Sequence, residues 1–238
     1  MLLYQPQNGY CYNSDTHFLF RFICKNLEKY KNIQGEVLDI GSGSGILGLL
    51  LAKKFDKLNL SQIEIQKSFQ FFSKKNTSVN NLVSKMYEGS FLEFEFGNKF
   101  DFCVSNPPFY HGDVIKSENE NIKIARYNDS MPLKEFIKKA SKVLKNGGKF
   151  FFCYDSKQLA EIILYLKEFK FNLETLQFVH PKATKEASLV MVFAKKDSKS
   201  LVKVFEPLIA FDEFGEFTKT VQDIYNEAGT HSIKVSFE

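Results

Sequence analysis

The stretch Val37-Leu38-Asp39-Ile40-Gly41-Ser42-Gly43-Ser44-Gly45 decides the fold class of this 238-residue chain. The apolar residues before Gly41 predict a short buried strand, and the leucine-rich residues after Gly45 predict a helix. Between them, the glycines follow the spacing G-x-G-x-G. Because glycine has no Cβ, they allow a sharp turn and a close approach of the backbone to a ligand. The stretch therefore predicts a ligand-binding loop between a strand and a helix.

Two carboxylates near this loop indicate what it binds. The glycine spacing is tighter than the G-x-G-x-x-G of dinucleotide enzymes, and Asp39 at the strand end would repel a pyrophosphate. The same carboxylate suits a ligand with a cationic amino-acid tail, such as S-adenosylmethionine. Glu64, at the end of the next predicted strand, can accept hydrogen bonds from both ribose hydroxyls. The alternative, a generic tight turn beside a surface glutamate, explains less of this agreement.

Apolar periodicity predicts that strands and helices alternate along most of the chain. We expect one domain over residues 1–238, with short N-terminal and C-terminal elaborations. Its fold class is α/β, with a Rossmann-like, seven-stranded, mostly parallel sheet, helices on both faces and an antiparallel edge strand. Asp15 is the expected cap of the first helix, and Asn146-Gly147-Gly148 the expected end of the fourth. The predicted strands are 36–40, 58–65, 85–87, 100–105, 149–154, 173–179 and 188–194, and the predicted helices are 15–31, 45–55, 67–76, 132–144, 156–169 and 218–225.

A second motif, Asn106-Pro107-Pro108-Phe109, follows the predicted strand 100–105. An exocyclic aromatic amine is a poor nucleophile, because its lone pair is delocalised into the ring. The Asn106 side-chain oxygen and the Pro107 carbonyl could accept hydrogen bonds from such an amine, while two prolines keep the turn rigid. Phe109 offers a flat face for stacking. The turn predicts methylation of a planar amine, governed by positioning; the alternative is a proline-terminated strand with an exposed Phe.

Composition and charge constrain the compartment and the partners. The 32 basic side chains exceed the 28 acidic ones by four, and the excess lies in residues 134–203. That region could attract a polyanion, or it could simply form solvated helix faces. The four cysteines lack metal or disulfide spacing and predict buried, reduced thiols. With no apolar run near the ~20 residues of a membrane span and no signal-peptide pattern, we expect a cytoplasmic protein with no metal, no membrane and no obligate protein partner.

The glycine loop with its carboxylates resembles that of class I S-adenosylmethionine-dependent methyltransferases. This resemblance implies S-adenosyl-L-methionine as cofactor and S-adenosyl-L-homocysteine as product. In that family an acid after the third strand often recognises the adenine ring, and Ser90 stands at this position here. Asn106 to Phe109 resembles the catalytic (D/N/S)PP(Y/F/W) turn of amino-methyltransferases, which act on base amines or on a glutamine amide. The expected cofactor-binding residues are Asp39, Gly41, Ser42, Gly43, Gly45, Glu64 and Ser90.

Segments near both ends resemble the bacterial tRNA1(Val) (adenine-37-N6)-methyltransferase family. The resemblance implies that the acceptor is N6 of an adenosine beside the tRNA anticodon, where a loop base can be swung out cheaply. It suggests Arg126, Lys182 and Lys185 as tRNA contacts, with His180 in a structural hydrogen bond. The polar segment 111–129 has the length of a lid or substrate loop. The matching segments are Gln7–Thr16, with Cys11 where the family often has Arg, Val179–Lys185, Glu206–Leu208 and Phe211–Thr218.

Other functions remain open on the sequence. A glutamine methyltransferase that acts on a release factor uses the same turn, although such enzymes usually carry a helical N-terminal domain, and only a short segment precedes the glycine loop here. Methylation of a ribosomal RNA or DNA amine is a further alternative. A non-catalytic cofactor-binding or RNA-chaperone module is disfavoured because Asp39, Glu64 and Asn106 are all present.

Overall fold

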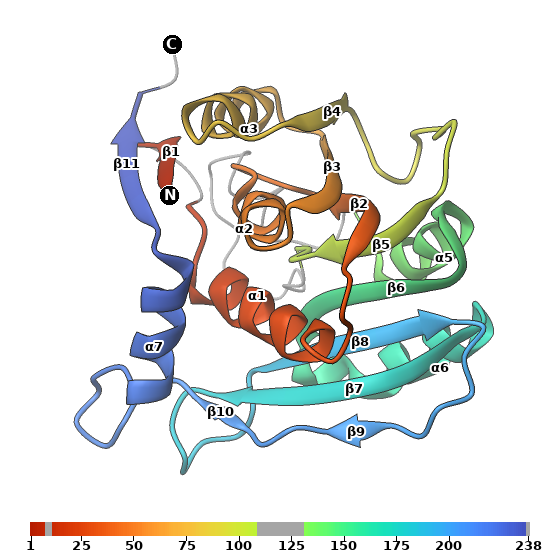
Figure 1. Cartoon of the computed structure of the whole chain (residues 1–238). Coiled ribbons are helices and arrows are strands. Elements are labelled where there is room, and N and C mark those ends of the chain that lie inside the picture. Colours follow the sequence, from red (N-terminus) through yellow and green to blue (C-terminus); the bar gives the residue numbers. More distant parts are fainter. Residues whose placement is uncertain (8–10, 109–130, 237–238) are drawn as a thin grey trace.

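A computed structural model of the chain describes residues 1–7, 11–108 and 131–236. Strands and helices alternate through most of this part of the chain (Figure 1). The strands are β1 (Leu2–Pro6), β2 (Gln34–Ile40), β3 (Lys57–Glu64), β4 (Ser84–Glu88), β5 (Phe100–Ser105), β6 (Leu144–Asp155), β7 (Phe171–His180), β8 (Leu189–Lys196), β9 (Lys203–Val204), β10 (Leu208–Ile209) and β11 (His231–Val235). The helices are α1 (Ser14–Leu27), α2 (Ile46–Lys54), α3 (Lys67–Val79), α5 (Leu133–Val143), the 3₁₀ turn η2 (Ser156–Gln158), α6 (Leu159–Glu168) and α7 (Lys219–Ala228).

The main sheet confirms the predicted α/β architecture but differs in two details. Its order is β10-β7-β8-β6-β5-β2-β3-β4, with β9 paired to β7, which makes nine strands rather than seven. The two extra strands have only two residues each, too few to show a period in the sequence. The antiparallel strand, β8, is not at the edge as expected; it lies between β6 and β7. Residues 189–194 of β8 are buried, whereas β7 is only partly buried. This burial suits β7 to a position farther from the centre of the sheet than that of β8.

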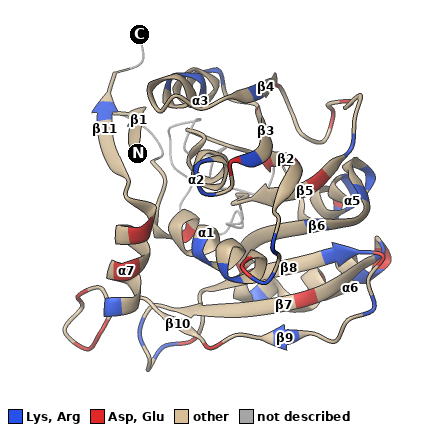
Figure 2. Cartoon of the chain, viewed as in Figure 1, with Lys and Arg blue, Asp and Glu red and all other residues tan. Residues whose placement is uncertain are grey.

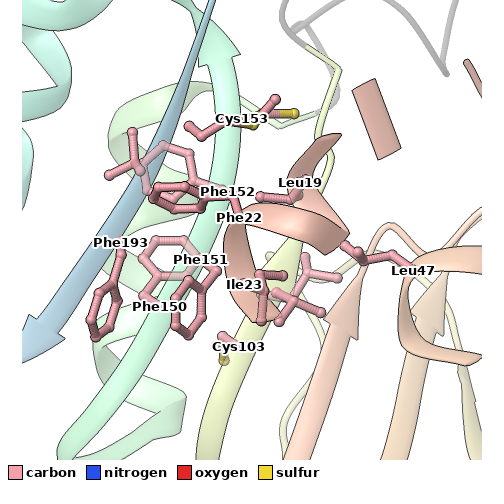
Figure 3. Packing of buried hydrophobic residues seen from close by; sticks show 14 of the residues in the cluster. Leu19, Phe22, Ile23, Leu47, Cys103, Phe150, Phe151, Phe152, Cys153 and Phe193 are labelled. Carbon is pink, nitrogen blue, oxygen red and sulfur yellow. The ribbon is translucent and has the colours of Figure 1, made fainter. Parts of the chain in front are cut away.

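Helices cover both faces of the sheet, and β6 shows why its sequence is a continuous apolar run. Helices α1, α2 and α3 lie on one face, and α5 and α6 on the other (Figure 1). The run Phe150–Phe152 sends its middle ring toward Phe22 of α1, with ring centroids 6.4 Å apart. Its two outer rings contact Phe136 of α5 at 5.2 and 5.7 Å. Figure 3 shows the three rings of this run in the buried cluster, together with Phe22 of α1.

Two helix ends differ from the sequence prediction. Helix α1 is capped by Asn13 rather than Asp15. Asn13 has an extended backbone, and its side-chain oxygen accepts a hydrogen bond from the backbone amide of Asp15 at 3.2 Å. Asp15 is already helical and cannot serve as the cap. Helix α5 ends at Val143, before the predicted Asn146-Gly147-Gly148 stop, because Leu144 adopts an extended conformation and pairs with Phe100 of β5.

A small parallel sheet of β1 and β11 was not predicted from the sequence. Side-chain amides from α3 replace a neighbouring strand for β1. The Asn76 side-chain oxygen accepts a hydrogen bond from the Tyr4 backbone amide at 2.7 Å, and its side-chain nitrogen donates to the Tyr4 carbonyl at 3.0 Å. The Asn80 side chain forms the same pair of hydrogen bonds with the backbone of Leu2. Asn76 also donates to the Ser44 carbonyl at 2.9 Å, so it connects β1 to the glycine loop.

Candidate active site

The glycine loop, Glu64 and Asn106 meet at one edge of the sheet. β2 lies between β3 and β5 and is parallel to both, so the carboxyl ends of the three strands coincide. Ligands of open α/β sheets bind at this edge. The Ser105 hydroxyl donates to the Ile40 carbonyl at 2.8 Å, which holds the ends of β5 and β2 together. The fold therefore brings together motifs that are far apart in the sequence.

Three glycines of the loop adopt left-handed backbone conformations, with φ of +63° at Gly41, +55° at Gly43 and +85° at Gly45. A Cβ at Gly43 would meet no atom within 4 Å, so this position faces open space. A Cβ at Gly45 would lie 2.6 Å from Gln62 Nε2 and 2.7 Å from Ser73 Oγ. Gly45 therefore packs closely against Gln62 and Ser73, and its expected contact with the cofactor stays a prediction.

Two neighbouring cavities share Gly41 as a lining residue. The first has a volume of about 430 Å³, part of it open to solvent, and joins the glycine loop to Asn106 and to the N-terminal segment. The second has a volume of about 340 Å³, also partly open to solvent, and joins Glu64 to Ser90 after β4. The first is lined by Tyr12, Thr16, Asp39, Gly41, Ser42, Gly43, Ser44, Ile46, Leu47, Phe69 and Asn106. The second is lined by Gly41, Ile63, Glu64, Ile65, Gly89, Ser90, Phe91, Leu92 and Met131.

Asp39 and Glu64 are both buried and accept backbone hydrogen bonds. Asp39 accepts the Gly48 amide at 2.9 Å, while Glu64 accepts the amides of Gly43 at 2.8 Å and Gln66 at 2.9 Å. Burial raises the pKa of Asp39 to about 7, with a further upward contribution from the Glu64 charge. Burial also raises the pKa of Glu64. A cation or a hydroxyl donor bound beside either carboxyl group would favour its ionised form.

Asn106 is held by side chains from two other elements. Its amide nitrogen donates to Thr16 Oγ1 of α1 at 3.0 Å, and its amide oxygen accepts from the Cys153 thiol of β6 at 2.9 Å. Pro107 is buried and Pro108 is half-buried. The fourth residue of the motif, Phe109, lies outside the described residues, as does Arg126 together with the predicted 111–129 loop.

The loop between β7 and β8 lies at the same sheet edge as Asn106. β6 ends beside it: the Ser156 amide donates to the Ser188 carbonyl at 3.3 Å. Lys182 donates through Nζ to the Glu213 carbonyl at 3.2 Å, and Lys185 is exposed. His180 donates through Nδ1 to the Lys185 carbonyl at 2.8 Å, which confirms its predicted structural role.

The basic excess of residues 134–203 does not form one continuous patch. Figure 2 shows lysines spread over α5, β8 and β9 and mixed with acidic side chains. Several of them form ion pairs, which favours the interpretation as solvated surface for this part of the excess. The pairs are Lys134–Glu168, Lys138–Glu135, Lys139–Glu95 and Lys145–Asp101.

Several residues that line the site were not predicted from the sequence. Tyr12 and Thr16 form part of the first cavity, and Ile65 and Met131 part of the second. Tyr12 and Thr16 lie in the Gln7–Thr16 segment that was recognised without a role. Cys153 was recognised only as a buried thiol; it is buried and free, as are Cys24 and Cys103. The described residues contain no helix that could cross a membrane and no cluster of three or more His, Cys, Asp or Glu side chains suited to a metal ion.

Known proteins resemble this chain in sequence and in fold. The sequence model of the methyltransferase small domain family matches residues 16–179. A tRNA1(Val) (adenine(37)-N6)-methyltransferase from Pedobacter heparinus is 25% identical over 158 residues, 65% of this chain and 67% of the relative. A release factor glutamine methyltransferase from Flavobacterium psychrophilum is 25% identical over 73% of this chain and 65% of the relative. The 16S rRNA N2 G1207 methyltransferase of T. thermophilus, solved with AdoMet and guanosine, has a TM-score of 0.58 at 22% identity, covering 80% of this chain and 45% of that one.

The sheet order, the glycine loop and the carboxylates at its edge define a Rossmann-like methyltransferase, a fold shared with a solved enzyme that holds AdoMet. The chain belongs to the methyltransferase small domain family, whose match extends from α1 to β7.

Proposed function

We propose that this protein transfers a methyl group from S-adenosyl-L-methionine to N6 of an adenosine beside the anticodon of a tRNA. One observation carries the proposal: the Asn106 side chain and the glycine loop line the same cavity. The curated relatives named for this reaction support the choice of acceptor.

The residues of the two cavities fit the cofactor. Bound S-adenosylmethionine would supply an electrophilic methyl group on a sulfonium. The Ser42 hydroxyl is buried in the first cavity without a hydrogen-bond partner among the described residues, which suits a polar ligand group there. Asp39 would hold the ammonium of the amino-acid tail. In the second cavity, Glu64 would accept from the ribose, while Ser90 and the apolar wall would face the adenine.

The raised pKa of Asp39 predicts that cofactor binding depends on pH. In the free protein this carboxyl, with a pKa of about 7, is largely protonated at lower pH. An ammonium group favours the ionised form, so binding below pH ~7 must release a proton from Asp39. Each unit by which the pH falls below ~7 should therefore raise Kd up to about tenfold, whereas Kd should stay nearly constant above that pH. Isothermal titration calorimetry between about pH 5.5 and about pH 8.5 would measure both Kd and proton release.

Two comparisons isolate Asp39 in that experiment, because Glu64 also has a raised pKa. Asp39→Asn should flatten the pH dependence. Methylthioadenosine, which lacks the amino-acid tail, should bind wild-type protein with little dependence on pH. A Kd for S-adenosylmethionine that stays constant across this range would contradict the role of Asp39.

The amine acceptor would be held by the Asn106 turn. The Asn106 oxygen and the Pro107 carbonyl would accept from the two N–H bonds of the amine, which favours a pyramidal nitrogen with an available lone pair. No strong base is needed, since the proton can leave after the methyl group arrives. Such a site works through placement, and a well-oriented pair of reactants can supply a large share of the rate enhancement.

Contacts with tRNA phosphates would come from the β7–β8 loop at the same sheet edge. Lys185→Ala and Lys182→Ala should each reduce the slope of log Kd for tRNA against log salt by about one, as expected for one lost phosphate contact. Cofactor affinity should not change. Lys57→Ala is the matched control, because Lys57 begins β3 at the opposite edge of the sheet. Equal slopes for all three variants would remove the β7–β8 loop from the tRNA interface.

The acceptor class can be decided by one competition assay. Labelled S-adenosylmethionine is incubated with the protein, total tRNA and a release factor, and the tRNA is digested to nucleosides for mass spectrometry. The proposal predicts label in tRNA as N6-methyladenosine. Label on the release factor without N6-methyladenosine would favour the glutamine methyltransferase alternative, for which one curated relative is named.

A further inference from the structure

The side-chain amide of Asn106 is fixed in one of its two orientations. An amide can rotate by a half-turn and exchange its oxygen and nitrogen, which would present the wrong group to an incoming amine. Here a thiol hydrogen from Cys153 points at one atom of the amide, and Thr16 Oγ1 lies beside the other. A thiol can donate to the amide oxygen but is a poor acceptor from the amide nitrogen, so the contact with Cys153 favours the orientation that turns the oxygen toward it.

Cys153 is suited to remain a donor. The residue is fully buried in the middle of the sheet, and its neighbours on β6 are aromatic. Burial, with a further contribution from the negative charge of Asp15, raises the pKa of the thiol well above its ordinary value. The thiol therefore keeps its proton across the pH range in which enzymes of this kind work. It is not placed to act as a nucleophile, which would require the thiolate.

The two partners of Asn106 come from different parts of the chain. Thr16 is in the first turn of α1, and Cys153 is near the end of β6. The Asn106 side chain therefore joins the N-terminal helix to the sheet at the cavity wall. After these two contacts, the amide oxygen still has a second lone pair, because an amide oxygen accepts two hydrogen bonds.

We propose that Cys153, with Thr16, is a positioning residue that orients the Asn106 amide so that its oxygen faces the substrate amine. This inference rests on the proposed function of Asn106 in binding an amine. Cys153 acts through Asn106 and touches neither donor nor acceptor. The pair disfavours the flipped amide, whose nitrogen would repel the N–H bonds of the acceptor.

Kinetics of paired variants test the positioning role. Cys153→Ala should lower kcat about tenfold, equivalent to one neutral hydrogen bond, with KM for both substrates nearly unchanged. Cys153→Ser restores a donor and should recover most of the loss. Thr16→Val should behave as Cys153→Ala does. Cys103→Ala is the matched control, because Cys103 is an equally buried thiol of β5 that lies outside the Asn106 contacts; it should lose stability but keep kcat.

An infrared measurement tests the contact independently of activity. The S–H stretching band of Cys153, assigned from the Cys153→Ala difference spectrum, should lie at lower frequency than that of Cys103 and should shift upward in Asn106→Ala. An unshifted band, or a Cys153→Ala variant with wild-type kcat, would overturn this inference. A wild-type protein that methylates no tRNA but shows the shifted band would overturn the proposed acceptor alone, and the contact would stand.

Discussion

Asn106→Ala is expected to lower kcat for methyl transfer by about 10²- to 10³-fold, the range seen when one preorganised polar group is removed from a reacting centre. The side chain lies at the wall of the cavity that holds the glycine loop, and two neighbours fix its orientation. Without the Asn106 oxygen, the substrate amine would lose one of the two hydrogen-bond acceptors that favour a reactive, pyramidal nitrogen. Single-turnover kinetics with saturating cofactor would measure the effect.

Cofactor binding separates this role from a general loss of structure. Kd for S-adenosylmethionine should change by less than about threefold, within the cost of one modest contact. Asn59→Ala serves as the matched control, since Asn59 is a surface asparagine of β3 that contacts Glu36. If Asn106→Ala retained the wild-type kcat, Asn106 would have no part in holding the acceptor.

Gly45→Ala should damage both the fold and the cofactor site. Alanine at φ +85° is strained, and its Cβ would lie 2.6 Å from Gln62 Nε2 and 2.7 Å from Ser73 Oγ. Gln62 cannot easily move, because its oxygen accepts from both Ser73 and Ser84 at 2.9 Å. We expect a loss of about 2–4 kcal/mol in the free energy of unfolding, from backbone strain and overpacking together, and a cofactor Kd at least about tenfold higher.

Gly147→Ala controls for backbone strain alone. Gly147 has φ of +72°, similar to that of Gly45, but a Cβ there meets no atom within 4 Å. This variant should lose only about 1–2 kcal/mol and should bind the cofactor normally. Chemical denaturation and calorimetric titration of both variants would test the comparison. Equal losses of stability, with unchanged cofactor affinity in Gly45→Ala, would show that the support beneath the loop is unimportant.

Much of the fold could be predicted because its signals are local. β5 was predicted residue for residue at 100–105, since its apolar run is bounded by a polar loop before it and prolines after it. The strand–loop–helix unit around Gly41 to Gly45 was predicted because glycine adopts such backbone conformations at the lowest cost. Glu64 was predicted at the end of one strand and Asn106 after another, and both lie at one edge because parallel strands align their carboxyl ends.

The features that were missed depend on residues far apart in the sequence. β1 and β11 pair across almost the whole chain, and on its other side β1 is bonded by the side chains of Asn76 and Asn80 rather than by a strand. β8 takes an inner place because it is buried on both faces. A short apolar run in the sequence does not show whether a strand lies inside the sheet or at its edge. Thr16 and Cys153 acquire their role only where α1 and β6 meet Asn106.

Methylation of a single defined adenosine tests the central claim most directly. A tRNA1(Val) transcript with adenosine at position 37 and a second with guanosine there are each incubated with the protein and S-adenosylmethionine. Mass spectrometry of nuclease fragments then maps the product. Our account predicts N6-methyladenosine at position 37 of the first transcript, no methylation of the second, and no product with Asn106→Ala. Methylation at another position in both transcripts would contradict this prediction. So would methylation of a release factor under the same conditions with no methylation of either transcript.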